Sequence, residues 1–289
     1  TCAHRCRPGG WRLSGGVQTG MVQQRFVVPR NAGRVRVAQI TDTHLEERDG
    51  GTLLGLDTDA SMEHVLRLLG TGEQRPDLIL ATGDLANHGS RAAYERLRRR
   101  FDALGIPWLW LPGNHDDAGQ MCVTLGDGAP MTRSVLVGGW HIVLLDSTIP
   151  GAVGGRLGVT ELQLLDQLLA LQPASPTLVC LHHQPVAIGC AWLDEQMIED
   201  APALFEMLAP HAQVRALLWG HVHQEFARQR GTLQLLAAPS TCVQFAPDSV
   251  GFRVDELAPG MRWLELRADG GLETRIERVQ GVIFPIDRD

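Results

Sequence analysis

The 289-residue sequence contains no lysine, so all 26 of its basic residues are arginine. Without lysine, the chain can form neither a Schiff base nor a Walker-type phosphate loop. The six cysteines include no close CxxC pair and no dense framework. A chain of this length needs no disulfides, and we therefore expect a reducing, cytoplasmic location. No stretch approaches the roughly 20 apolar residues that a bilayer span requires, so we expect no membrane association.

Positive charge is also in deficit, because the formal net charge is −7. An acidic protein has no broad positive field to attract phosphate, which argues against nucleic-acid binding. Hydrophobic residues make up 44% of the chain, enough for a packed core. Residues 1–20 include no apolar segment of the kind that a targeting signal needs. We predict that residues 1–24 are a disordered extension and that residues 25–289 form a single domain.

Short apolar runs alternate with amphipathic segments along the rest of the chain. Runs with the length of buried strands lie at 35–40, 78–81, 108–111, 141–145, 178–181 and 216–219. Helices are expected at 61–69, at 91–104 between Ser90 and Gly105, and after a capping-box pattern at Thr160 and Gln163. Asp269-Gly270-Gly271 predicts a hairpin. The pattern is that of an α/β domain with its sheets buried between helical layers.

Polar residues follow five of the apolar runs, at the point where each predicted strand ends. The sequences are Asp42-Thr43-His44, Gly83-Asp84, Gly113-Asn114-His115-Asp116, His182-His183 and Gly220-His221-Val222-His223. Ligands bind α/β sheets in the crevice at the carboxyl ends of the strands. The spacing of two residues in Asp42/His44 and His221/His223 places both side chains on one face if the backbone is extended. We therefore expect the five strand ends to meet at one rim.

This rim offers seven nitrogen or oxygen donors: Asp42, His44, Asp84, Asn114, His182, His221 and His223. One octahedral ion needs six ligands, and protein sites usually leave some positions to water. Seven donors with one carboxylate able to bridge suit two ions roughly 3.5–4 Å apart. Imidazole combined with carboxylate and amide favours Mn, Fe, Zn or Ni over Ca or Mg.

The ordered set DTH, GD, GNHD, H and GHVH resembles the signature of the calcineurin-like binuclear metallophosphoesterases, from about residue 35 to the end. The flanking segments ITDTHL (40–45), LHHQP (181–185), GHVHQE (220–225) and PSTCVQF (239–245) resemble one branch, the bacterial class III 3′,5′-cyclic-AMP phosphodiesterases. The resemblance implies a β-sandwich of two mixed sheets flanked by helices, in αββα layers. It also implies hydrolysis of 3′,5′-cyclic AMP to 5′-AMP.

The resemblance further implies a role for each residue. Asp42, His44, Asp84 and His223 would hold a first metal, often iron in this family; Asp84, Asn114, His182 and His221 would hold a second, often manganese. A hydroxide bridging the two ions would attack phosphorus. His115 would protonate the leaving oxygen as catalytic acid, and Asn114 and His115 would contact the substrate.

The chain departs from the family at one position. Many members carry Asp three residues after the bridging Asp, where it orients the acid histidine, and here that residue is Asn87. His115 could instead use Asp116 or His88. Three alternatives stay open: another diester such as a 2′,3′-cyclic nucleotide, a phosphomonoester, and a scaffold without catalysis. Whether the chain forms a homodimer also stays open.

Overall fold

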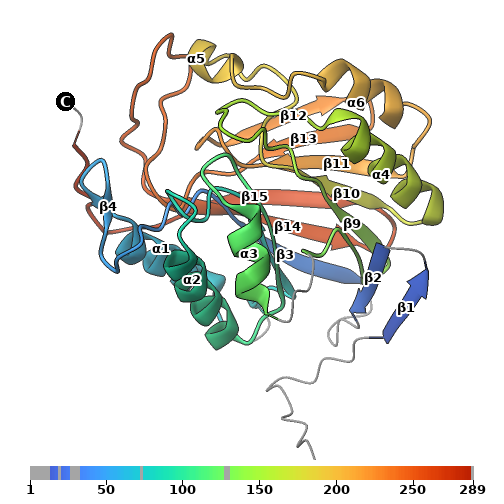
Figure 1. Cartoon of the computed structure of the whole chain (residues 1–289), viewed down its shortest axis with the longest axis horizontal. Helices are drawn as coiled ribbons and strands as arrows, with labels where there is room; N and C mark the ends of the chain where they lie inside the picture. The colour runs from blue at the N-terminus through green and yellow to red at the C-terminus, as the bar shows by residue number, and fades with distance from the viewer. Residues whose placement is uncertain (1–13, 19–20, 27–32, 72–73, 127–130, 288–289) are drawn as a thin grey trace, which may run out of the picture.

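Two β-sheets stacked face to face form the centre of the computed structural model, which describes residues 14–18, 21–26, 33–71, 74–126 and 131–287 (Figure 1). Apolar side chains from both sheets meet in one core cluster, which includes Val37 and Leu80 of one sheet and Leu178 and Leu218 of the other. Further cores cover the two outer faces. The chain therefore has the αββα layers that the sequence predicted.

The five-stranded sheet has the order β15-β14-β3-β6-β7. Its strands are β3 (Arg34–Ile40), β6 (Leu78–Thr82), β7 (Trp108–Leu111), β14 (Gly260–Arg267) and β15 (Leu272–Arg278). The pairs β3–β6 and β6–β7 are parallel, whereas β14 pairs antiparallel with both β3 and β15. The β14–β15 hairpin turns at Asp269-Gly270-Gly271, which confirms that prediction.

The other sheet has eight strands in the order β1-β2-β8-β9-β10-β11-β13-β12. They are β1 (Ser14–Gln18), β2 (Met21–Phe26), β8 (Ser134–Val137), β9 (Trp140–Leu144), β10 (Thr177–Cys180), β11 (Val214–Trp219), β12 (Phe226–Arg230) and β13 (Leu233–Ala237). The strands β9, β10, β11 and β13 are parallel to one another. Strand β8 pairs antiparallel with β9, and β12 pairs antiparallel with β13. A separate two-stranded hairpin joins β4 (Thr52–Leu53) to β5 (Leu56–Asp57).

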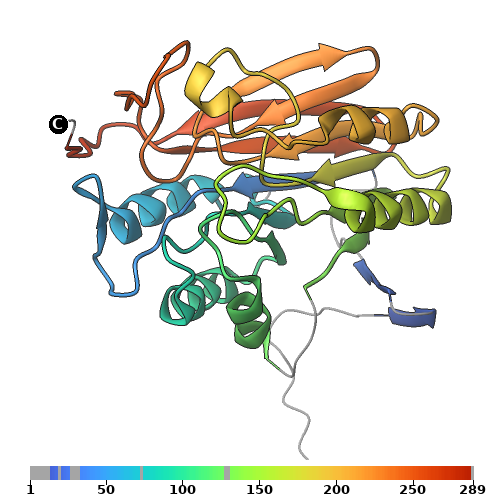
Figure 2. The same cartoon turned by 45° about the horizontal axis from the view of Figure 1, so that its top comes forward.

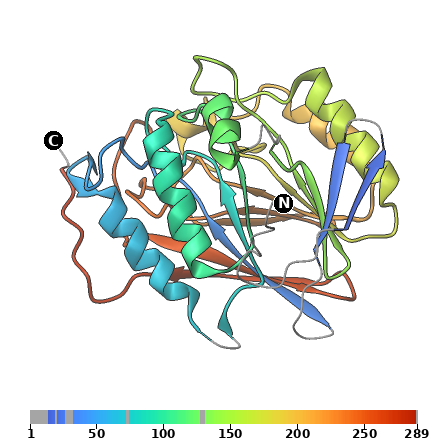
Figure 3. The ribbon, with the colours of Figure 1, turned by 60° about the horizontal axis from the view of Figure 1, so that its bottom comes forward.

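Helices cover the outer face of each sheet (Figures 1 and 3). On the five-stranded sheet lie α1 (Thr58–Leu66), continued by a 3₁₀ turn over Arg67–Leu69, α2 (Arg91–Leu104) and α3 (Ala118–Leu125). On the eight-stranded sheet lie α4 (Gly158–Leu171) and α6 (Ala201–Leu208), which contact each other (Figure 2). The short α5 (Ala191–Asp194) lies among the loops. No helix in the described residues is long and apolar enough to cross a bilayer.

The helix starts differ from two expectations. Helix α1 begins three residues early because the Asp57 carboxylate caps it by accepting the N–H of Ala60. Helix α4 begins at Gly158, so Thr160 is not its cap and the predicted capping box is wrong. Instead, the Asp200 carboxylate accepts the N–H groups of Leu157 and Gly158 at 3.0 and 2.7 Å. These bonds satisfy donors at the helix start that the local sequence leaves unpaired.

The N-terminal segment includes strands where the sequence predicted an extension. Strand β1 pairs antiparallel with β2, and β2 pairs parallel with β8. Because β2 spans Met21–Phe26, it crosses the boundary expected at residue 24. The rest of the predicted extension, residues 1–13 and 19–20, lies outside the described residues, and the division of the chain at residue 24 stays a prediction.

Candidate metal centre

The strands β3, β6, β7, β10 and β11 end at one place, and the loops after them are tied together by backbone hydrogen bonds. Asp42 donates its N–H to the carbonyl of Gly83 at 3.0 Å, which joins the loops after β3 and β6. Gly220 donates to the carbonyl of His182 at 3.1 Å, which joins the loops after β11 and β10. Across the two sheets, His221 donates its N–H to Oδ1 of Asp42 at 3.1 Å. The two sheets thus bring their carboxyl ends together, as the position of the polar residues predicted.

Asp84 lies between two histidines at this rim. Its Oδ2 is 3.2 Å from Nε2 of His182 and 3.8 Å from Nε2 of His44. His223 Nε2 lies 3.5 Å from Oδ1 of Asp42 and 3.1 Å from Nε2 of His44. Side chains from four distant parts of the chain therefore offer donor atoms that lie within 4.8 Å of one another in groups of three, and such groups could hold a metal ion.

Five of the seven expected ligands have a left-handed backbone. The φ angles are 54° at Asp42, 43° at His44, 50° at Asp84, 65° at His221 and 49° at His223. The two-residue spacing had suggested an extended backbone, and this prediction is wrong because φ is positive at these residues. The paired side chains still converge. Positive φ is uncommon outside glycine and costs about 1–3 kcal/mol per residue. Such strain gathers at functional sites, where the surrounding structure holds it in place.

Two glycines allow the loops to approach this closely. A Cβ at Gly113 would lie 2.2 Å from Oδ1 of Asp84 and 2.4 Å from its backbone nitrogen. A Cβ at Gly83 would lie 2.3 Å from Nδ1 of His182. Any side chain at these positions would displace an expected ligand, so the close packing of the loops requires glycine.

The second ring nitrogen of each expected histidine ligand has a partner of its own. Nδ1 lies 2.8 Å from the Val243 carbonyl in His223, 2.8 Å from the Thr82 carbonyl in His182 and 3.2 Å from Asn87 Oδ1 in His44. His221 uses Nε2, which lies 3.0 Å from Gln196 Oε1. Such outer bonds fix the tautomer and leave the other nitrogen for a metal.

The donor set passes a further test of fit to a cation. The Oδ1 atom of Asn114 is buried, and no hydrogen-bond partner for it exists in the part of the chain that the structure describes. A buried carbonyl oxygen without a partner is costly, and a cation would satisfy it. The residues present therefore suit the metal ions that the sequence implied.

Burial and neighbouring charges act in opposite directions on the ionisable groups at the rim. Burial alone would raise the pKa of Asp84, but the adjacent His182 holds this pKa well below its usual range. Burial alone would lower the pKa of His182, but the neighbouring Asp84 carboxylate outweighs this effect and raises the pKa of His182 to about 9. Burial lowers the pKa of His44 to about 3. The carboxylates are therefore ionised at neutral pH, and a cation would release the proton on His182.

Residues 35–225 match the family model of the calcineurin-like phosphoesterases. The chain belongs to this family. It is 48% identical over 261 residues to the 3′,5′-cyclic adenosine monophosphate phosphodiesterase CpdA of Pseudomonas aeruginosa, covering 90% of this chain and 96% of the relative. It is 43% identical to CpdA of Escherichia coli K12, covering 88% and 93%. A 3′,5′-cyclic-nucleotide phosphodiesterase of Nostoc is 40% identical, covering 85% and 92%.

Solved structures show the same fold at low sequence identity. The purple acid phosphatase PPD1 from yellow lupin superposes with a TM-score of 0.65 at 14% identity, covering 91% of this chain and 55% of that chain. GAP50 of Plasmodium superposes with a TM-score of 0.59 at 13% identity, covering 88% and 89%. The family and fold inferred from the motifs are therefore confirmed.

A backbone carbonyl, rather than the Asp side chain that many family members have at position 87, holds the ring of His115. The ring Nδ1 lies 2.9 Å from the backbone carbonyl of Asn87, whose side chain turns to His44 instead. The Asn87 amide donates to Oε1 of Glu46 at 2.6 Å, which directs Oδ1 toward His44. His115 itself is exposed, and its ring edge meets His44 at 4.8 Å between centroids.

Neither Asp116 nor His88, the two alternative partners, orients the ring of His115. The Asp116 carboxylate accepts the N–H groups of Leu85, Ala86 and Gly113 and the hydroxyl of Tyr94, so it binds the loops after β6 and β7 together. His88 lies beside the Asn87 amide and Glu46 with its side chain 75% exposed. The expectation that either residue orients His115 is wrong.

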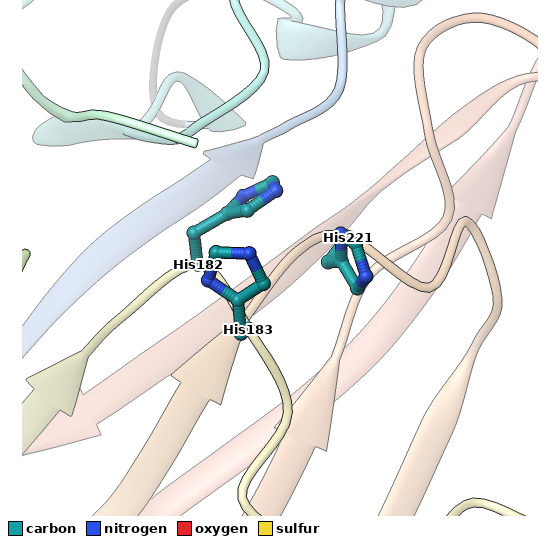
Figure 4. Close-up of side chains that lie close together, drawn as sticks. All are labelled: His182, His183 and His221. Carbon is teal, nitrogen blue, oxygen red and sulfur yellow. The ribbon is translucent and has the colours of Figure 1, made fainter. Parts of the chain in front are cut away.

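His183 lies in the wall of the site and was not among the expected ligands (Figure 4). Its ring is 4.9 Å from that of His182 and 4.8 Å from that of His221. Both of its nitrogens have partners, because Nδ1 lies 2.8 Å from Ser147 Oγ and Nε2 lies 3.0 Å from the Val153 carbonyl. Burial lowers the pKa of His183 to about 3. A neutral ring with both nitrogens engaged supports the neighbouring histidines rather than a metal.

Proposed function

We propose that the seven rim residues hold two metal ions. Asp42, His44, Asp84 and His223 hold the first, which we propose to be iron, and Asp84, Asn114, His182 and His221 hold the second, which we propose to be manganese. The observation that carries this proposal is the position of Asp84, whose Oδ2 lies 3.8 Å from His44 and 3.2 Å from His182. An ionised carboxylate between two imidazoles is the arrangement that a shared ligand needs.

We propose that the chain hydrolyses 3′,5′-cyclic AMP to 5′-AMP. The relatives named for this activity support the proposal, because the chain matches them over nearly their whole length. When bound, two such ions supply a nucleophile from water and neutralise charge on phosphate. Water adds its oxygen to phosphorus, the bond from phosphorus to O3′ breaks, and O3′ takes up a proton.

His115 supplies that proton. Its Nδ1 is engaged with the Asn87 carbonyl, which leaves Nε2 for the leaving oxygen. The backbone N–H of His115 donates to Oδ1 of Asp84 at 2.9 Å, so the acid and the shared carboxylate keep a fixed separation. Asn114 precedes His115 in the same turn and contacts the phosphate together with it. General acids of this kind accelerate a reaction by about 10²- to 10⁴-fold.

A substrate panel tests the function. Protein reconstituted with metal is assayed on 3′,5′-cyclic AMP, 3′,5′-cyclic GMP, 2′,3′-cyclic AMP, an aryl diester and an aryl monoester. We expect the highest kcat/KM on 3′,5′-cyclic AMP. Preference for the 2′,3′-cyclic nucleotide or for the monoester would replace this proposal by one of the alternatives, and loss of all turnover with metals bound would favour a scaffold.

We also propose that the native metals are iron and manganese, that two copies of the chain pair, and that the protein is cytoplasmic. Elemental analysis of protein purified without added metal identifies the ions, with iron and manganese expected. A mass measurement in solution tests whether two copies pair. Cell fractionation tests the cytoplasmic location.

A further inference from the structure

Three aromatic rings lie beside the candidate metal centre and have no part in the reaction described above. Phe245 stacks flat on His223, with 4.2 Å between ring centroids and 7° between the planes. Trp192 and Phe252 meet Phe245 edge-on at 5.1 and 5.5 Å, and they lie 5.4 Å from each other. We call Phe245, Trp192 and Phe252 the aromatic shelf. The shelf extends from the expected ligand His223 through Phe245 to Phe252, which is 58% exposed to solvent.

The segment around α5 links the shelf to the other half of the centre. It carries Trp192 of the shelf and, four residues later, Gln196, whose Oε1 lies 3.0 Å from Nε2 of His221. One short segment therefore contacts the expected ligand His221 through Gln196 and the ring of Phe245 through Trp192. The shelf and Gln196 therefore contact one expected ligand each, His223 and His221.

The exposed ring of Phe252 is held in place rather than loosely attached. Ala246 donates its N–H to the carbonyl of Arg253 at 2.8 Å, which closes the loop that carries Phe252. The Ser249 carbonyl accepts the N–H of Ala191, and Ser249 Oγ lies 3.2 Å from Trp192 Nε1. Figure 1 shows this orange-red loop beside α5. Phe252 is 58% exposed and adjoins Trp192 and Phe245, so the three rings form one contiguous apolar patch rather than a single exposed side chain, and such patches mark binding surfaces.

We propose that the aromatic shelf binds the purine base of the cyclic nucleotide, an inference that rests on the function proposed above. The phosphate of the substrate is held at the metals, and its base must lie a short distance to one side. The shelf begins at Phe245, which stacks on the expected ligand His223 with 4.2 Å between ring centroids, and it continues as apolar ring surface to the exposed Phe252. Replacing an aromatic ring that stacks on a base by alanine typically weakens binding by about 10-fold.

Phe252→Ala tests this proposal in metal-loaded, full-length protein. The substrates are 3′,5′-cyclic AMP and the same cyclic ribose phosphate without a base. We expect the KM for cyclic AMP to rise about 10-fold with kcat nearly unchanged, and the KM for the substrate without a base to stay the same. Phe252→Trp keeps a ring and should restore the parent KM. Ile283→Ala, at an apolar side chain that is 94% exposed, is the matched control.

Two outcomes would overturn the inference. The first is an unchanged KM for cyclic AMP in Phe252→Ala; if the mass in solution changes at the same time, the shelf is a contact between copies of this chain. The second is an equal rise in KM for both substrates, which would place the effect at the metals. Failure of the proposed function gives a different result, since the parent protein would then turn over other esters and not cyclic AMP.

Discussion

The backbone carbonyl of Asn87 holds the ring of His115, at 2.9 Å from Nδ1, while the Asn87 side chain holds His44. One residue thus positions both the proposed acid and an expected metal ligand, through different atoms. Because the acid depends on the backbone alone, the change from Asp to Asn at this position does not remove its support. The side chain is free to serve the metal site.

Asn87→Ala should therefore weaken metal binding more than catalysis. The substitution removes the partner of His44 Nδ1, and loss of such an outer bond typically costs 10- to 100-fold in metal affinity. The kcat of the fully loaded enzyme should stay within about threefold, since the carbonyl that holds His115 remains. Titration with Mn²⁺ and assays at saturating metal measure the two effects. Val159→Ala, at an apolar side chain of α4 that is 70% exposed, is the control. A large drop in kcat with unchanged affinity would contradict this assignment.

His115→Ala should keep both metals and lose turnover according to the leaving group. The His115 N–H that binds Asp84 belongs to the backbone and survives the substitution. We expect about 10²- to 10⁴-fold loss on cyclic AMP, whose alkoxide is a poor leaving group, and a much smaller loss on a 4-nitrophenyl diester. Elemental analysis checks the metals. Retention of full activity on cyclic AMP would exclude the acid role.

The sequence predicted the rim because its signal is local. Apolar runs such as β6 and β10 are buried over their whole length, and the residue type changes abruptly to Asp or His where they end. Parallel strands then bring those ends together without further information. The two-layer order of the sheets came from the resemblance of the motifs to a known family, since periodicity alone does not specify strand order.

The remaining features depend on contacts between residues that are far apart in the sequence. The start of α4 is set by Asp200, more than 40 residues later in the chain. His183 is engaged by Ser147 and Val153, and Asn87 by Glu46, and no local pattern marks these pairs. The aromatic shelf joins residues from α5 and from the loop after β13, which the sequence shows as unrelated phenylalanines and a tryptophan.

Gly113→Ala should weaken metal binding strongly without unfolding the chain. Its Cβ would lie 2.2 Å from Oδ1 of Asp84, so the loops after β6 and β7 must separate. We expect metal occupancy to fall by more than half in elemental analysis, while the circular dichroism spectrum stays that of the parent. Gly154→Ala is the control, because its Cβ would come no nearer than 3.6 Å to other atoms. Full occupancy in Gly113→Ala would mean that the site tolerates this displacement.

His141 should make the stability of the metal-free protein fall as the pH is lowered. Its ring is buried in β9 with Nε2 2.7 Å from Ser134 Oγ, and burial lowers its pKa from 6.5 to about 4. The unfolded chain takes up a proton below pH 6.5, whereas the folded chain resists until about pH 4. Stability from this residue is therefore complete above pH 6.5 and decreases toward pH 4, by up to about 3 kcal/mol.

Urea unfolding from pH 8 to pH 4.5 measures this dependence. His141→Gln should be less stable than the parent at pH 8, where it lacks the histidine's packing, yet lose less stability on acidification. The difference between the two curves isolates His141 from the other buried histidines, which titrate in both proteins. His88→Gln, at an exposed ring, should follow the parent curve throughout. Parallel curves for the parent and His141→Gln would show that His141 contributes nothing to the acid sensitivity.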